Sequence, residues 1–328
     1  MAKLNLKLPD SFYKEEVRDG YTVSSEMKKV WAVELDLFKQ LDYICRKYNI
    51  TYYADSGTLL GAVRHQGFIP WDDDMDFIMY RKDFEKLCKV SSELKYPYFF
   101  QTEETDPGSL RCHGQLRNSS TTGILKSEEK CEYPFNQGIF IDIFPIDNIP
   151  DNKNELKKFV RHLRNLKIRA RAYYDYNHGI NTDVSCSNIK QVLKQGLKRI
   201  IVNPVRKIYY TKVWNEYRGK NPYYAEYMRE VVKYNKEKTN YVMDLVFGTN
   251  FNLLSKKDIG KPKYLPFEGM KMPVPQNPEP ILKAYYGNWH IMVKGKNAHG
   301  GCLFDTEKPY TSYITKDQCK RLKTKYLS

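Results

Sequence analysis

The chain has 328 residues, enough for one large domain or two with a substantial buried core. It carries 54 Lys and Arg against 39 Asp and Glu, a formal net charge of +15 at pH 7. A balance this positive predicts a polyanionic neighbour, such as a nucleotide substrate, a nucleic acid or an anionic membrane surface.

Cysteine usage and hydropathy narrow the cellular setting. The seven cysteines form no CxxC pair and show no regular spacing, so we expect free thiols in a reducing cytosol rather than a disulfide or zinc framework. The N-terminal MAKLNLKLPD lacks the apolar region of a secretory signal, and no stretch approaches the roughly 18 apolar residues of a spanning helix. We therefore expect a cytoplasmic protein, or one peripheral on the cytoplasmic face of the inner or plasma membrane.

The first 150 residues alternate helical and strand patterns. Ser24 and Ser25 can cap a helix that runs to about Tyr48, with Trp31 as a core residue. Next come a strand at 50–54, a turn at 55–57 that opens a short helix, a strand at 75–80, a helix at 82–90, and strands at 97–102 and 138–145. This order predicts an α/β (α+β) fold in which helices flank a small mixed sheet.

Composition changes after Pro150. Residues 155–212 hold fourteen Lys or Arg and three acidic residues, a net charge of +11, in two segments that resemble amphipathic helices around a loop at 177–188. A solvated helical hairpin and a helix pair in an anionic membrane interface both fit this pattern. No nucleic-acid-binding motif occurs, so no nucleic acid is expected as a partner.

These patterns divide the chain into three segments. Residues 1–150 are expected to form a catalytic core, and residues 151–240 a basic helical insertion. Residues 241–328, rich in proline and tyrosine, predict a short hairpin, an ordered loop and a helix that packs back onto the core.

Four aspartates lie within five positions in WDDDMDF, directly before an apolar run. Such carboxylates repel one another and need a cation or hydrogen bonds if they are buried. Side chains alternate faces along a strand, so Asp74 and Asp76 point the same way and form a hard-oxygen site for Mg²⁺ or Mn²⁺. Asp72 is spaced two residues from Asp74 and would face the same side, but it precedes the strand. Asp73 is expected to face away as a solvated residue or loop cap.

Two further features strengthen the metal interpretation. Ser56, Gly57 and Thr58 end a strand and open a helix, where backbone N–H groups and the helix dipole favour a phosphate. Asp142 stands alone in the apolar strand GIFIDIF, where a shared metal would compensate its burial. This layout is that of a nucleotidyltransferase-like fold with two-metal phosphoryl transfer chemistry.

Basic residues near this region are candidate anion contacts. Arg64 and His65 fall between the phosphate turn and the aspartates. Arg117 lies in RCHGQLRNSSTTG, a predicted loop or strand edge near the site, and is either an anion contact or half of a surface salt bridge. Lys294, Lys296 and His299 could meet the acceptor or a phosphate. The donor-phosphate set is therefore Ser56, Gly57, Thr58, Arg64, His65 and Arg117.

Three blocks of the sequence resemble the LicD family of phosphorylcholine transferases, whose motif the fukutin-related proteins share. DSGTLLGAVRHQGFIPWDDDMDF is similar to the defining motif, GIFIDIFPID to the second block and YYGNW to a weaker third block, in which Asn288 stands where an acid is common. The resemblance implies transfer of a phospho-substituent from a CDP-linked donor to a sugar hydroxyl, with CMP leaving.

The resemblance also assigns roles to individual residues. Asp74 and Asp76 match the metal-binding Asp-x-Asp and Asp72 the preceding acid. Asp142 matches the third carboxylate, as metal ligand or as base. The catalytic set is thus Asp74, Asp76 and Asp142, and the metal set adds Asp72. Gly57 and Thr58 would line the donor phosphates.

Our first hypothesis is a Mg²⁺- (or Mn²⁺-) dependent phosphotransferase that decorates a teichoic acid, capsule or lipopolysaccharide precursor. CDP-choline is the expected donor and a lipid-linked glycan the expected acceptor. The alternatives are a nucleotidyltransferase that releases pyrophosphate, a non-catalytic membrane or nucleic-acid binding module that uses the basic segment, and a glycosyltransferase with an Asp-x-Asp motif.

Overall fold

A computed structural model of the chain describes residues 2–107, 109, 111–126, 128, 135–177, 203–217, 220–246, 253–294 and 301–314. The chain divides into two compact units. Unit 1 comprises Met1–Leu156 and Tyr234–Ser328, and unit 2 comprises Lys157–Lys233. The predicted loop at 177–188 and most of the second predicted basic helix lie outside the described residues.

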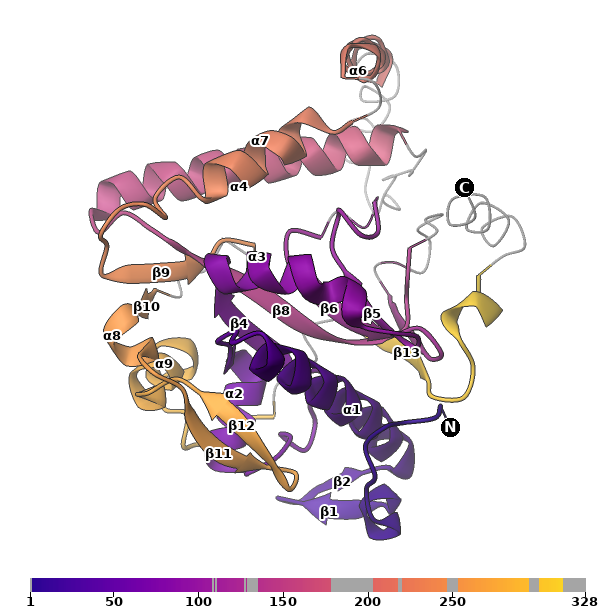
Figure 1. Ribbon diagram of the computed structural model, residues 1–328. Helices are drawn as coiled ribbons and strands as arrows, with labels where there is room; N and C mark the ends of the chain where they lie inside the picture. Colours follow the sequence, from indigo (N-terminus) through magenta and orange to yellow (C-terminus); the bar gives the residue numbers. More distant parts are fainter. Residues whose placement is uncertain are drawn as a thin grey trace, which may run out of the picture. The chain divides into compact units, whose positions relative to one another are not determined.

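The main sheet of unit 1 has the order β10-β9-β8-β4-β3, and β5 joins it through β6, which also pairs with β8 (Figure 1). Only the β4–β8 pair is parallel, so the sheet is mixed, as the sequence predicts. Its strands are Tyr53–Ala54 (β3), Asp76–Tyr80 (β4), Tyr98–Gln101 (β5), Gly114–Asn118 (β6), Ile139–Asn148 (β8), Tyr241–Asp244 (β9) and Leu254–Ser255 (β10).

Strand β8 organises this sheet because it pairs along both of its edges. One edge carries β4, in register Asp76↔Asp142 to Tyr80↔Ile146. The other edge carries β6 along the first half of β8 and β9 along its end. Every residue of β8 except the last is buried, which agrees with its continuous apolar sequence.

Helix α1 (Ser25–Lys47) packs against β6 and β8 (Figure 1). The hydroxyl oxygen of Ser24 accepts a hydrogen bond from the backbone N–H of Met27 (3.2 Å), which confirms the predicted N-cap. Trp31 is a core residue, as expected, and stacks on Phe68 with ring centroids 4.5 Å apart.

The other helices of the core follow the sequence pattern closely. They are α2 (Ser56–Arg64), α3 (Arg81–Val90), α8 (Lys256–Ile259) and α9 (Pro278–Tyr286), with short 3₁₀ turns at Asp10–Tyr13, Ser91–Glu93 and Tyr310–Ser312. The first residue of α3, Arg81, forms a buried ion pair with Asp147 at the end of β8, through Nε–Oδ1 (2.9 Å) and Nη2–Oδ2 (2.5 Å). Residues 253–294 include the predicted hairpin and helix, and α9 packs against α2.

Three two-stranded sheets complete unit 1. They are β1 (Glu16–Arg18) with β2 (Tyr21–Val23), β11 (Lys263–Phe267) with β12 (Met270–Val274), and β7 (Thr122–Leu125) with β13 (Cys302–Asp305). The sequence did not predict the first or the last of these pairs.

Unit 2 is helical in its described part. It contains most of α4 (Lys153–Asn177), together with α6 (Asn203–Glu216) and α7 (Pro222–Val231). Tyr173, Tyr210 and Val213 form its small buried cluster. No helix among the described residues is long and apolar enough to cross a membrane, and Cys45, Cys88, Cys112 and Cys302 are free thiols.

Candidate active site

Two carboxylates meet across the parallel strand pair β4–β8 of the main sheet. Asp76 begins β4 and stands directly opposite Asp142 in the middle of β8. Side chains directly opposite on neighbouring strands share one face of a sheet, so the two carboxyl groups are adjacent. Burial raises the pKa of Asp76 well above its ordinary value, and the charges of Asp74 and Asp142 raise it further.

The other aspartates form a tight group in the segment before β4. Asp72, Asp73 and Asp74 each place a carboxylate oxygen within 4.8 Å of the others. The expectation that Asp73 faces away is wrong, because its side chain is buried with this group (8% exposed). The alternation of side chains between the two faces of a strand does not apply to Asp73, because β4 begins only at Asp76. Burial, followed by the charges of Asp74 and Asp73, raises the pKa of Asp72.

The start of helix α2 lies against this acidic group. A Cβ atom on Gly57 would come within 2.4 Å of Asp72 Oδ2, so only glycine allows the carboxylate to approach the helix this closely. The hydroxyl oxygen of Thr58 accepts a hydrogen bond from the backbone N–H of Asp76 (2.8 Å) and so holds the first residue of β4. The positive end of the α2 dipole therefore faces the place where negative charge gathers.

The C-terminal YYGNW block reaches the same place. The Tyr285 hydroxyl donates to Asp55 Oδ1 (3.1 Å), and the hydroxyl of Ser56 donates to Asp55 Oδ2 (3.1 Å). Burial raises the pKa of Tyr286, and the charges of Asp55 and Asp76 raise it further. The sequence analysis singled out this block but assigned no role to Asp55 or to either tyrosine.

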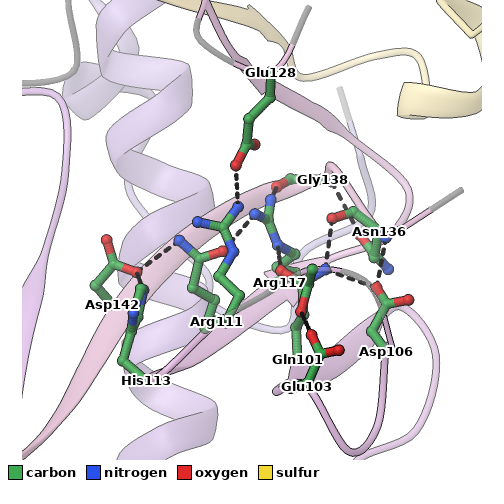
Figure 2. A network of polar contacts seen from close by, with 12 residues as sticks. Gln101, Glu103, Asp106, Arg111, His113, Arg117, Glu128, Asn136, Gly138 and Asp142 are labelled. Carbon is green, nitrogen blue, oxygen red and sulfur yellow. Dashed lines mark hydrogen bonds and ion pairs between the residues drawn. The ribbon is translucent and has the colours of Figure 1, made fainter. Parts of the chain in front are cut away.

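Asp142 is held by two side chains from the segment around β6 (Figure 2). His113 Nε2 lies 3.0 Å from Asp142 Oδ1, and the amide Nε2 of Gln115 donates to the same oxygen (2.7 Å). Burial alone would raise the pKa of Asp142, but His113, the charge of Arg111 and the Gln115 hydrogen bond hold it below its ordinary value. Asp142 is therefore poised as an anion beside Asp76, whose pKa is raised.

Arg117 has a different position from the one expected. It lies on β6, which is a fully buried strand and not a loop, and its side chain has no exposed surface. Its guanidinium donates to Gln101 Oε1 (2.6 Å), to the Gly138 carbonyl (2.6 Å) and to Gln115 Oε1 (Figure 2). With these acceptors it orients the Gln115 amide toward Asp142, so we withdraw it as a donor-phosphate contact and regard it as a positioning residue.

The remaining basic candidates have other partners. Arg64 Nη1 donates to the Trp289 carbonyl (2.8 Å) and its Nε donates to His65 Nε2 (2.9 Å). The other ring nitrogen of His65, Nδ1, lies 2.9 Å from Asp19. Burial lowers the pKa of His65, which suits a neutral imidazole that accepts from Arg64. Lys294 lies over the ring of Tyr21 (4.7 Å), and Lys296 and His299 lie outside the described residues.

Sequence reasoning missed one acidic residue of this region, Glu34 on α1. Its side chain is 1% exposed, and burial followed by the charges of Asp74, Asp73, Asp72 and Asp76 raises its pKa well above the ordinary value. An acidic residue on the apolar face of a predicted helix was the only signal available.

These residues fit a divalent cation. Mg²⁺ and Mn²⁺ prefer carboxylate oxygens, and Asp72, Asp73 and Asp74 place such oxygens within 4.8 Å of one another. Asp76 and Asp142 are paired on the two adjacent strands but lie outside this group of three. Without a cation this much negative charge raises carboxyl pKa values, as Asp72 and Asp76 show.

The raised pKa of Asp72 predicts a pH effect in cation-free buffer. The folded chain binds the Asp72 proton more tightly than the unfolded chain does, so this contribution to stability is complete below the ordinary value of 3.8 and is lost as pH rises through the raised value. In EDTA, the free energy of unfolding should therefore rise as the pH falls toward 3.8, and it should rise more steeply for the wild type than for Asp72→Asn. Urea denaturation at several pH values measures this, and equal slopes would contradict it.

Comparisons with known proteins agree with this geometry. Residues 49–177 match the family model described as LicD/FKTN/FKRP, nucleotidyltransferase domain. Over 148 residues the chain is 29% identical to the lipopolysaccharide cholinephosphotransferase LicD of Haemophilus influenzae. This alignment covers 44% of this chain and 54% of that relative. Shorter segments are 44% identical over 63 residues to an uncharacterized protein of Rickettsia typhi and 42% identical over 76 residues to one of Rickettsia prowazekii.

The mixed sheet with its paired acidic strands and the matching family model agree in pointing to a nucleotidyltransferase-type domain. Residues 49–177 are similar to the LicD family, as the sequence blocks indicate. The match spans about half the length of the Haemophilus influenzae relative, and 20% and 29% of the two rickettsial ones.

Proposed function

We propose that the chain is a Mg²⁺- or Mn²⁺-dependent phosphotransferase. It moves phosphocholine, or a related phospho-alcohol, from a CDP-linked donor to a sugar hydroxyl of a cell-surface glycan and releases CMP. The observation that carries this proposal is the pairing of Asp76 with Asp142 beside the Asp72–Asp74 group. The match to the LicD family and the activity named for the Haemophilus influenzae relative support the reaction class.

The proposed roles follow from the contacts. Asp72, Asp74, Asp76 and Asp142 are the oxygen donors for the cation, which when bound neutralises phosphate charge and lowers the pKa of an attacking hydroxyl. The backbone N–H groups that begin α2 at Ser56 and Gly57 lie where a donor phosphate would be stabilised by the helix dipole.

His113 and Gln115 orient Asp142 and keep it ionised, by the two hydrogen bonds to its Oδ1 atom. An ionised, oriented carboxylate suits either of two roles, cation ligand or acceptor of the proton from the sugar hydroxyl.

We place the acceptor, a teichoic acid, capsule or lipopolysaccharide precursor, at an anionic membrane surface. Unit 2 carries 18 Lys or Arg against five acidic residues, and all of it lies in the proposed insertion at 151–240. On α6, Val205, Ile208 and Tyr209 are 63%, 74% and 51% exposed, next to Lys207 and Lys212. Exposed apolar side chains among lysines favour an interface of anionic lipid headgroups. No nucleic acid is part of this proposal.

The donor can be identified by calorimetric titration. Purified protein is titrated with CDP-choline, CDP-ethanolamine, CDP-glycerol and CDP-ribitol, each with and without Mg²⁺. We expect one of these donors to bind only with Mg²⁺, and CMP to appear when the matching glycan acceptor is added. Arg46→Gln is a suitable control variant, because it breaks an exposed ion pair, Arg46–Asp42, that includes no residue of the candidate site.

Two outcomes would overturn the proposal. Binding of none of the four CDP compounds would remove the donor assignment. Consumption of a nucleoside triphosphate with release of pyrophosphate would instead show a nucleotidyltransferase reaction, which the family description also names.

A further inference from the structure

Helix α1 is attached to the acidic group by a direct contact. The indole Nε1–H of Trp31 donates to the backbone carbonyl of Asp72 (3.0 Å). Residues three apart on a helix lie on the same face, one turn along. Glu34 therefore follows Trp31 on the face of α1 that borders the Asp72–Asp74 group.

Glu34 is buried and has no compensating partner among the described residues. Its side chain is 1% exposed, and its Oε2 atom is buried without a hydrogen-bond partner. Lys28 and Arg18, which lie over the ring of Trp31, both pair with Glu16. Burial and the charges of Asp72, Asp73, Asp74 and Asp76 oppose ionisation of Glu34, so its carboxylate form requires a cation that these side chains share.

A second buried acid on the same helix shows what a satisfied carboxyl group looks like in this fold. Asp36 is fully buried, yet its Oδ1 accepts from the Leu6 backbone N–H (2.6 Å) and its Oδ2 accepts from the Tyr98 hydroxyl (2.6 Å). Glu34 lacks such donors for Oε2, so structural hydrogen bonding does not explain its presence.

We propose that Glu34 is an additional oxygen donor for a divalent cation, Mg²⁺ or Mn²⁺, bound at the Asp72–Asp73–Asp74 group. This inference rests on the proposed function, because it assumes that the acidic group holds a cation. It adds a carboxylate ligand from α1 to the proposed cation site. The bound cation would then link the segment before β4 to helix α1. The free Oε2 atom is the group available for that bond.

The test is a direct measurement of cation affinity, independent of turnover. Mn²⁺ binding is followed by electron paramagnetic resonance, and Mg²⁺ binding by calorimetry, in the full chain and in Glu34→Gln, Glu34→Leu and Asp36→Asn. Loss of a cation-site partner typically costs 10- to 100-fold in metal affinity. We expect losses of about that size in both Glu34 variants, with the leucine variant the weaker because glutamine keeps a neutral carbonyl oxygen.

The matched control is Asp36→Asn, which alters a buried acid of the same helix and should bind Mn²⁺ as the wild type does. Thermal denaturation in EDTA adds a second readout. Both Glu34 variants should be at least as stable as the wild type there, because each removes a buried carboxyl group whose Oε2 atom has no hydrogen-bond partner.

The failures are distinguishable. Wild-type affinity in both Glu34 variants overturns the inference and leaves the proposed function standing. A wild-type chain that binds neither cation overturns the inference together with the metal part of the proposed function. A loss of affinity in Asp36→Asn equal to that in the Glu34 variants would show a general effect of altering α1, and so would also overturn the inference.

Discussion

Asp76→Asn is expected to lower turnover by on the order of 10³-fold or more while the fold remains intact. Charge stabilisation by a bound metal is worth several kcal/mol, and each 1.36 kcal/mol corresponds to a tenfold change in rate. Asparagine keeps the shape of the side chain and leaves the backbone N–H free to donate to the Thr58 hydroxyl oxygen. The measurement is CMP release from the donor identified by calorimetry, at saturating Mg²⁺.

Stability separates this prediction from a folding defect. Burial and the charges of Asp74 and Asp142 oppose ionisation of Asp76, so a neutral amide should not lower the melting temperature in EDTA. An Asp76→Asn variant with wild-type turnover would remove this residue from the metal site. A variant that unfolds in EDTA would show instead that the carboxylate is structurally required.

Arg117→Met is expected to reduce both stability and turnover. The substitution leaves three buried acceptors on Gln101, Gly138 and Gln115 without their donor. An unsatisfied buried acceptor costs about 1–3 kcal/mol, and relief of the buried cation offsets part of the sum, so we expect a loss of about 3–5 kcal/mol in the free energy of unfolding. Burial already lowers the pKa of Arg117 to about 10.

The effect of Arg117→Met on turnover comes through Gln115. Without the guanidinium the Gln115 amide is free to rotate, and Asp142 then loses the 2.7 Å hydrogen bond that orients it. We expect kcat to fall at a temperature where the variant is folded, with little change in donor affinity. Donor binding is measured by calorimetry and folding by circular dichroism.

Arg81→Met provides the matched control. It also removes a buried arginine and leaves Asp147 without its cationic partner, which typically costs about 3–5 kcal/mol, and the hydrogen bonds that it removes are to Asp147 at the end of β8. Equal losses of kcat in the two folded variants would mean that Arg117 acts only through stability.

The sequence was sufficient for those parts of the fold with strong local signals. The apolar face and Ser24 cap predict α1, and the run after the aspartates predicts β4, because such patterns are set by side-chain period alone. From the sequence, Asp76 and Asp142 could be expected to lie close together only because a shared metal ion would compensate their charges. Their register joins positions 66 residues apart in sequence and depends on how β4 and β8 pair.

The errors have a common physical cause. The segment that holds Gln115 and Arg117 was predicted to be a loop or strand edge, but both residues lie in a buried strand and hydrogen-bond one another and their neighbours. Charged residues are rarely fully buried unless they are paired, so a pattern-based prediction places them at the surface. Glu34 was missed for the same reason, since its surroundings are assembled from α1 and the distant turn before β4.

The order of β8 and β9 has a consequence for how this protein can change over time. The two strands pair antiparallel, and the Tyr234 hydroxyl donates to Glu155 (2.9 Å), so the chain leaves and re-enters unit 1 at neighbouring points. The entropic cost of closing a loop grows only slowly with its length. Segments of very different size and composition can therefore be exchanged between those points without disturbing the strands that carry Asp76 and Asp142.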